Sequence, residues 1–182
     1  MNLSTPGFEG RRLPFARARA GELKVHPEPC FPTPPLRAGH RAVERVKFGG
    51  NVFVDTSAFI ALRVADDVKY TKAQHFLTVI KETRLRLHTT NFILDEVYTY
   101  FCRFHEVAME MAELIIENPL ITLYRVSPED EKTGLEILKT FNDKDFSYTD
   151  ATSFAVMQRL NIHTAFAFDE HFTQYGKFVI VP

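Results

Sequence analysis

The feature of this sequence that most restricts its fold is the alternation, after residue 50, of short apolar runs with longer amphipathic stretches. Residues 52–54 form an apolar, β-branched and aromatic run that is typical of a buried strand. Further strand candidates are 85–89, 122–126, 165–168 and 178–181, and helical patterns between them cover 57–64, 69–84, 91–117, 128–142 and 147–161. Strands that alternate with helices predict an α/β fold, a three-layer α/β/α sandwich with a mostly parallel central sheet. The long pattern over 91–117 is consistent with two helices that are broken near residues 103–106.

Residues 1–47 differ in composition from the rest of the chain. They hold nine Lys or Arg residues against four acids, and seven of the ten prolines. Such a segment buries too little apolar surface to offset the entropy of ordering, so we expect a disordered extension over 1–47 and one folded domain over 48–182. An inert tail, or the product of an upstream start site, is favoured over a nucleic-acid-binding arm because the positive charge is scattered. The prolines also disfavour an amphipathic targeting helix.

The remaining composition restricts the compartment. Two cysteines, Cys30 and Cys102, are too few for a disulfide framework, which favours a reducing, cytoplasmic location. No apolar run approaches the roughly 18 residues that a membrane-spanning helix needs, and the first twenty residues lack the apolar core of a secretory signal. We therefore expect no association with a membrane.

Two aspartates follow predicted strands directly. Asp55 comes directly after residues 52–54, and Asp169 comes directly after residues 165–168. Ligands of open α/β sheets bind beyond the carboxyl ends of the strands, so both carboxylates should lie at the same edge of the sheet. Each aspartate, taken singly, is better explained as the N-cap of a helix, where Asp is a preferred residue.

Two further acids belong to helices that follow strands. Asp150 stands three residues after Ser147, the spacing of a capping box, and alone this stretch favours capping. Glu96 lies on the margin of the apolar stripe of a helix for which Asn91 is the expected N-cap. A glutamate held against the core needs a partner, which can be a basic side chain, a water or a metal ion. Its neighbour Asp95 points further round the helix and is expected to be solvated.

The four acids together change the balance between capping and ligation. Each of them follows a strand or belongs to a helix that follows one, so all four can converge on one rim of the sheet. Converging carboxylates repel one another and either take up protons or bind a cation. An all-oxygen site suits a hard ion such as Mg²⁺ or Mn²⁺, whose commonest use with this ligand set is phosphodiester hydrolysis. That chemistry requires neither His105 nor His171, which we interpret as ordinary loop and helix-start residues.

At this point the sequence resembles a known family. The stretches VDTSAF, TTNFILDEV, DFSYTDATSFA and AFAFDEHF, in this order, resemble those of PIN domains, and most closely the VapC-type toxin ribonucleases of toxin–antitoxin pairs. The resemblance covers essentially the whole chain after residue 50. It implies an endoribonuclease of the cytoplasm that depends on Mg²⁺ or Mn²⁺, with an RNA substrate, a cognate antitoxin and a homodimeric state.

The resemblance also implies roles for individual residues. Four acids correspond to the family's metal-binding and catalytic core: Asp55, Glu96, Asp150 and Asp169. Thr56, Ser57 and Thr149 fall at positions where hydroxyl groups support those acids. Asp145 aligns with an acid that often precedes the third stretch, and we expect it to act indirectly or structurally.

Other classes of protein stay open to different degrees. A haloacid-dehalogenase-type phosphatase would need Asp at position 57, which is Ser, and a receiver domain would need a late Lys that FDEHF does not supply. A PIN-fold nuclease that processes RNA or acts on structured nucleic acid without being a toxin remains an alternative. So does a non-catalytic interaction module, although a degenerate copy usually loses one of its acids.

Overall fold

The computed structural model describes residues 23–26, 50–83 and 85–182, and its centre is a five-stranded sheet. The strands stand in the order β3-β2-β1-β4-β5, and every pairing between neighbours is parallel. Their bounds are Asn51–Val54 for β1, Arg86–Thr90 for β2, Ile121–Tyr124 for β3, Thr164–Phe166 for β4 and Val179–Val181 for β5. The first strand of the sequence is therefore the central strand of the sheet, which explains its apolar character on both faces.

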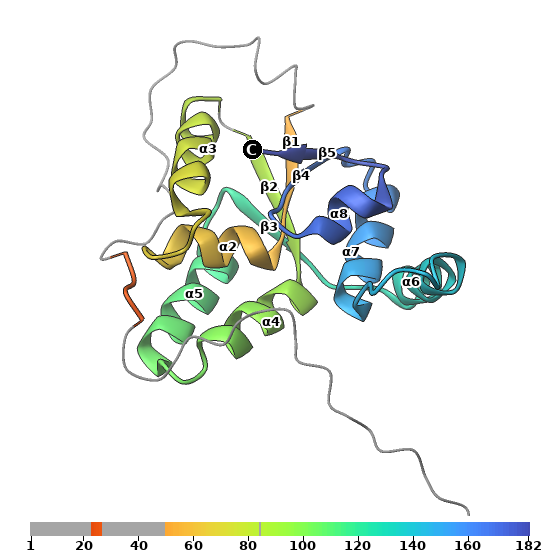
Figure 1. The fold of residues 1–182 in the computed structure, drawn as a ribbon, viewed down its shortest axis with the longest axis horizontal. Coiled ribbons are helices and arrows are strands. Elements are labelled where there is room, and N and C mark those ends of the chain that lie inside the picture. Colours follow the sequence, from red (N-terminus) through yellow and green to blue (C-terminus); the bar gives the residue numbers. More distant parts are fainter. Residues whose placement is uncertain (1–22, 27–49, 84) are drawn as a thin grey trace, which may run out of the picture.

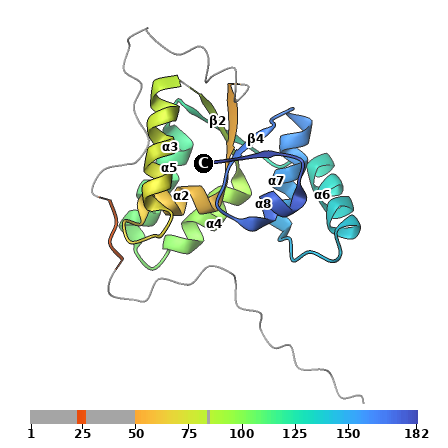
Figure 2. The ribbon, with the colours of Figure 1, turned by 45° about the horizontal axis from the view of Figure 1, so that its top comes forward.

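Helices cover both faces of this sheet. One face carries α2 (Thr56–Arg63), α3 (Tyr70–Thr83), α4 (Asn91–Phe101) and α5 (His105–Glu117), and the other carries α6 (Pro128–Thr140), α7 (Tyr148–Arg159) and α8 (Glu170–Tyr175) (Figures 1 and 2). The chain runs outward from β1 through β2 to β3, then crosses to β4 on the other side of β1. Right-handed crossovers in the two directions place the helices on opposite faces. The expected α/β/α sandwich with a parallel sheet is confirmed.

Most element boundaries agree with the sequence pattern to within a few residues, and two local points differ. The long helical pattern is indeed two helices, because α4 ends at Phe101 and α5 begins at His105. The helix α8 did not appear among the predicted elements; six residues are too few to show a helical period. The expected N-cap Asn91 is also wrong. Thr90 caps α4 by accepting a hydrogen bond from the amide of Ile93, while the side chain of Asn91 accepts one from the amide of Val126.

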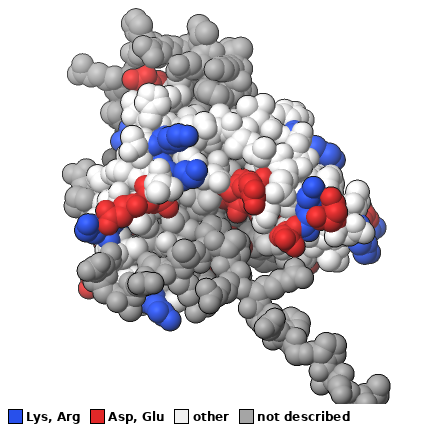
Figure 3. All heavy atoms as spheres, viewed as in Figure 1, with Lys and Arg blue, Asp and Glu red and all other residues white. Residues whose placement is uncertain are grey.

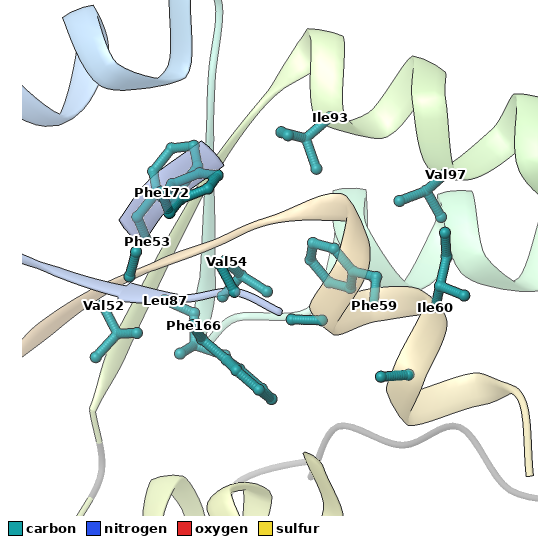
Figure 4. Close-up of a cluster of buried hydrophobic side chains, with 14 of the residues drawn as sticks. Val52, Phe53, Val54, Phe59, Ile60, Leu87, Ile93, Val97, Phe166 and Phe172 are labelled. Carbon is teal, nitrogen blue, oxygen red and sulfur yellow. The ribbon is translucent and has the colours of Figure 1, made fainter. Parts of the chain in front are cut away.

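The core consists of large apolar side chains on both faces of the central strands. Figure 4 shows Phe53 next to Phe172 of α8, and their ring centroids are 6.3 Å apart. On the opposite face of the sheet, Phe166 packs edge-on against Phe76 of α3 at 4.8 Å. These rings are all buried, so the helices on both sides are fixed to β1 and β4 by contacts that bury large apolar areas.

A short part of the N-terminal region contacts the domain. Val25 forms an antiparallel bridge with Val64, and the carbonyl of His26 accepts a hydrogen bond from the buried side chain of Arg63. The rest of residues 1–47 lies outside the described residues, so the predicted disordered extension stays a prediction. Among the described helices none is both long and apolar enough to cross a membrane.

Candidate functional site

The four acids singled out in the sequence lie at the carboxyl ends of the strands. Because β1 and β4 are parallel neighbours, Asp55 and Asp169 follow them at the same edge of the sheet. Asp150 belongs to the first turn of α7, and Glu96 to the second turn of α4. Figure 3 shows acidic side chains on the face of the molecule near α8, with basic side chains beside them.

Asp55 is held in place by the serine two residues after it. It is the N-cap of α2, and its Oδ2 accepts hydrogen bonds from the backbone amide of Ser57 at 2.9 Å and from the Ser57 hydroxyl. The same hydroxyl accepts a hydrogen bond of 2.9 Å from the amide of Phe168, at the end of β4. Ser57 therefore ties the start of α2 to the neighbouring strand and fixes the carboxylate between them.

Glu96 takes its position from two threonines. The hydroxyl of Thr56 donates a hydrogen bond of 2.7 Å to Oε2 of Glu96, and the side chain of Thr149 bonds to the same carboxylate. Val97, the next residue of α4, is fully buried, whereas Asp95 is exposed as expected. Glu96 thus bridges the starts of α2 and α7 from the margin of the apolar stripe.

Asp150 and Asp169 each combine capping with a contact to His171. Oδ2 of Asp150 accepts a hydrogen bond of 2.7 Å from the amide of Ser147, in a complete capping box. Asp169 is the N-cap of α8, and its Oδ1 accepts a bond of 2.8 Å from the amide of His171. The ring Nδ1 of His171 lies 2.9 Å from Oδ2 of Asp150 and 3.3 Å from Oδ1 of Asp169. A single imidazole therefore links the two carboxylates.

The pKa values show that these carboxylates share one electrostatic environment. The pKa of Asp55 is raised to about 7, mainly by burial and to a smaller extent by the charges of Asp150 and Asp169, while the hydrogen bonds from Ser57 act in the opposite direction. Burial is also the main cause that raises the pKa of Glu96 and of Asp169, and the charge of Asp150 adds to both. Hydrogen bonding to Asp150 is the main cause that raises the pKa of His171 to about 9. The cluster has an excess of negative charge, as a cation site would.

The donor set suits a hard divalent cation. In Asp55, Asp150 and Asp169, the hydrogen bonds among the described residues engage one carboxylate oxygen and leave the other available. Carboxylate oxygens are the ligands that Mg²⁺ and Mn²⁺ prefer. Over the described part of the chain, no group of three or more His, Cys, Asp or Glu side chains is arranged so that it could hold a metal ion. The chemistry of the donors therefore fits such an ion, and binding it requires the carboxylates to draw together.

The remaining residues from the sequence analysis divide into two groups. Thr56, Ser57 and Thr149 contact the acids, as described above, whereas Asp145 is exposed in the segment before α7. Sequence reasoning set aside His171, which the structure places between two of the acids. Its position two residues after an N-cap aspartate would have marked it, had α8 been recognised. His105 begins α5 and is exposed.

Comparison with known proteins decides the family. Residues 52–178 match the model of the PIN domain. The chain belongs to the PIN domain family. This PIN domain is 30% identical over 133 residues to the 23S rRNA-specific endonuclease VapC20 of Mycobacterium tuberculosis, an alignment that covers 72% of this chain and 98% of the relative. A VapC ribonuclease of Archaeoglobus fulgidus is 30% identical over 111 residues, which cover 60% of this chain and 71% of that protein.

Solved structures give the same result for the fold. The crystal structure of VapC20, described as a toxin that cleaves the sarcin–ricin loop, superimposes with a TM-score of 0.65 at 29% identity and covers 72% of this chain and 99% of that one. VapBC2 of Rickettsia felis, bound to a DNA fragment from its promoter, has a TM-score of 0.53 at 10% identity, and covers 71% of this chain and 96% of that one. At that identity the second likeness shows the PIN fold alone.

Proposed function

We propose that this PIN domain protein is a divalent-metal-dependent endoribonuclease that hydrolyses phosphodiester bonds of RNA, and that it is the toxin of a toxin–antitoxin pair. The observation that carries the proposal is that four carboxylates lie at one edge of the sheet, near enough for their charges to act on one another, with the pKa raised in three of them: Asp55, Glu96 and Asp169. Relatives named as an endonuclease of 23S rRNA and as a ribonuclease support the same activity.

In this proposal the four acids hold one or more Mg²⁺ or Mn²⁺ ions. When bound, such an ion orients phosphate oxygens, offsets the charge that develops on them and favours ionisation of an attacking water. Asp55 is the central ligand, because it follows the central strand and Ser57 fixes its carboxylate from two sides. Asp150 and Asp169 present the oxygens that their helix caps leave available.

Glu96 has a different role, because it is the one acid of the four that belongs to neither a cap nor a capping box. Its carboxylate is bridged between Thr56 and Thr149, which face it from two helix starts. We assign to it the orientation of the attacking water or direct ligation of the ion. Its raised pKa makes this carboxylate a stronger proton acceptor than an ordinary glutamate.

The partners follow from the same assignment. RNA is the substrate, an antitoxin encoded with the toxin is the protein partner, and the active protein is a cytoplasmic homodimer. The relative VapC20 is described as a toxin, which supports a protein partner that counteracts it. Light scattering on the purified full chain measures the oligomeric state directly, and a monomer at micromolar concentration would contradict the dimer.

The deciding experiment is cleavage of a mixed RNA panel by the full chain with Mg²⁺, Mn²⁺ or EDTA, in parallel with Asp55→Asn. We expect cleavage that needs the ion and is lost in the variant. Cleavage that persists in Asp55→Asn would overturn the site. Specific cleavage without any growth effect on expression would instead favour an RNA-processing nuclease, and no binding of Mn²⁺ by calorimetry would favour a non-catalytic module.

A further inference from the structure

Among the residues that the structure describes, His171 is the one basic side chain with a recorded direct contact to the acid cluster. It lies in the first turn of α8, its side chain is 13% exposed, and its Nδ1 approaches a carboxylate oxygen of Asp150 and one of Asp169. The catalytic scheme above assigns it no role. Its position raises the question of what a ring held between two metal ligands does for them.

The contact with His171 gives one carboxylate oxygen of Asp150 a second hydrogen-bond donor. Oδ2 of Asp150 accepts a bond of 2.7 Å from the amide of Ser147, within its own helix, and one of 2.9 Å from Nδ1 of His171. The two donors come from α7 and α8, so this oxygen is held from both sides. Oδ1 has no hydrogen bond among the described residues, which leaves it as the oxygen that can face an ion.

The histidine ring is itself fixed by the core. Its edge packs against the ring of Phe146 with centroids 5.5 Å apart and an angle of 70° between the planes. Phe146 is buried, and it also contacts Phe154 of α7 edge-on at 5.4 Å. The imidazole therefore has one orientation, in which Nδ1 points to the acids. A hydrogen on Nδ1 satisfies this contact whether the ring is neutral or charged.

Resting on the proposed nuclease function, we propose that His171 is a positioning residue of the metal site. Its Nδ1–H fixes the carboxylate of Asp150 and ties α8, with Asp169, to α7. The two aspartates then present their remaining oxygens toward the same point. Groups that orient metal ligands in this way typically change metal affinity about 10- to 100-fold when they are removed.

Three substitutions separate the hydrogen bond from the packing of the ring. In His171→Asn the amide nitrogen stands where Nδ1 stood, bonded to Cγ, whereas in His171→Gln it lies one bond further out, near the position of Nε2. His171→Ala removes both. His105→Ala is the matched control, because His105 is also at the start of a helix and is exposed.

The first measurement is Mn²⁺ binding to the full chain by calorimetry, with RNA cleavage measured beside it. We expect His171→Ala and His171→Gln to bind Mn²⁺ at least about 10-fold more weakly, and His171→Asn and His105→Ala to bind close to the unmodified protein. Unchanged affinity in His171→Ala would overturn the proposal. Equal losses in the Asn and Gln variants would also overturn it, because the ring and not its Nδ1 would then be responsible.

A second measurement does not depend on the metal. In EDTA, urea unfolding of His171→Ala, Asp150→Ala and the double variant forms a thermodynamic cycle. We expect the double variant to lose less stability than the two single losses combined, because the first substitution already breaks the shared bond. Additive losses would overturn the positioning contact. A coupled cycle in a protein that neither binds Mn²⁺ nor cleaves RNA would contradict the nuclease function, while the contact itself would stand.

Discussion

Two adjacent helices of this protein begin in the same way and serve different purposes. α6 starts with Ser127 and has Asp130 three residues later, and α7 starts with Ser147 and Asp150 in the same relation. Both capping boxes are complete, since each serine side chain and each aspartate carboxylate accepts the expected bond. The aspartates are 2% and 8% exposed, and the helices lie side by side (Figure 1).

The two aspartates differ in the side chains that they contact. Both oxygens of Asp130 accept hydrogen bonds from the guanidinium of Arg159, at 2.7 and 2.9 Å. Burial alone would raise the pKa of Asp130, but the bonds from Arg159 and Ser127 outweigh it and lower the pKa. The carboxylate of Asp150 instead raises the pKa of three neighbouring acids. Asp130 thus lies opposite an arginine, whereas Asp150 lies among other acids and beside His171, where we propose that a cation binds.

The sharpest test of this difference is RNA cleavage by Asp150→Asn and Asp130→Asn. Loss of a charged ligand at the reacting centre should lower the rate of cleavage by Asp150→Asn at least about 100-fold, the scale seen when one group that stabilises the transition state is removed. Asp130→Asn should cleave nearly as well as the unmodified protein, because its carboxylate serves the pairing of α6 with α7. Initial rates with Mn²⁺ measure both, and similar losses in the two variants would abolish the distinction.

The dependence of folding stability on pH should have opposite signs for Asp55 of the acid cluster and for Asp130 of α6. The pKa of Asp55 is raised from 3.8 to about 7, so the folded state keeps its proton longer and this group destabilises the metal-free fold as the pH rises from 4 to 7. The pKa of Asp130 is lowered, so its contribution is full above pH 3.8 and is lost as the pH falls below that value.

Urea unfolding in EDTA across this range, compared with Asp55→Asn and Asp130→Asn, measures each contribution as a difference. The increase in the free energy of unfolding caused by Asp55→Asn should grow between pH 4 and 7 and reach on the order of a few kcal/mol. The decrease in the free energy of unfolding caused by Asp130→Asn should become smaller as the pH falls below 3.8. A gain from Asp55→Asn that does not change with pH would show that its carboxyl group titrates normally.

At neutral pH the substitutions that remove each charge should differ in their effect on stability. Asp130→Asn breaks a two-bond ion pair and should lower the free energy of unfolding by about 2 kcal/mol, reduced from the value for a fully buried pair because Arg159 is partly exposed. Asp150→Asn in EDTA removes repulsion from the neighbouring acids together with the attraction of His171, so it should lower the free energy of unfolding less than Asp130→Asn does. Chemical denaturation of both variants tests this, and a larger loss for Asp150→Asn would contradict the electrostatic account.

The smallest expected effect is the one that the two helices share. Ser127→Ala and Ser147→Ala each remove the side chain that accepts from the third amide of the helix, and each should cost about 1 kcal/mol of stability. Neither should change cleavage much, because the bond from the Ser147 backbone to Asp150 does not involve the serine side chain. Unequal losses, measured by thermal unfolding, would show that the two capping boxes already differ locally.

The sequence alone determined the elements of the fold, because their signals are local. Short apolar runs predicted every strand of the sheet, and apolar periodicity predicted all helices except α8. The acids at strand ends were recognisable for the same reason, since a strand followed by Asp places that Asp at the carboxyl edge. Capping and metal ligation could not be separated, because both need the same residue at the same place. In Asp55, Asp150 and Asp169 the hydrogen bonds of the helix start engage one carboxylate oxygen, and we propose that the other oxygen binds the ion.

Tertiary structure decided which groups face one another. Nothing near Ser147 or Ser127 in the sequence says that Asp130 meets Arg159, or that Asp150 meets His171. These partners are 29 and 21 residues away, and their approach depends on how α6, α7 and α8 pack on the sheet. A carboxylate carries the same charge in either place. Whether it stabilises the fold as part of an ion pair or favours the binding of a cation depends on the charges within a few ångströms. Only the folded chain brings those charges together.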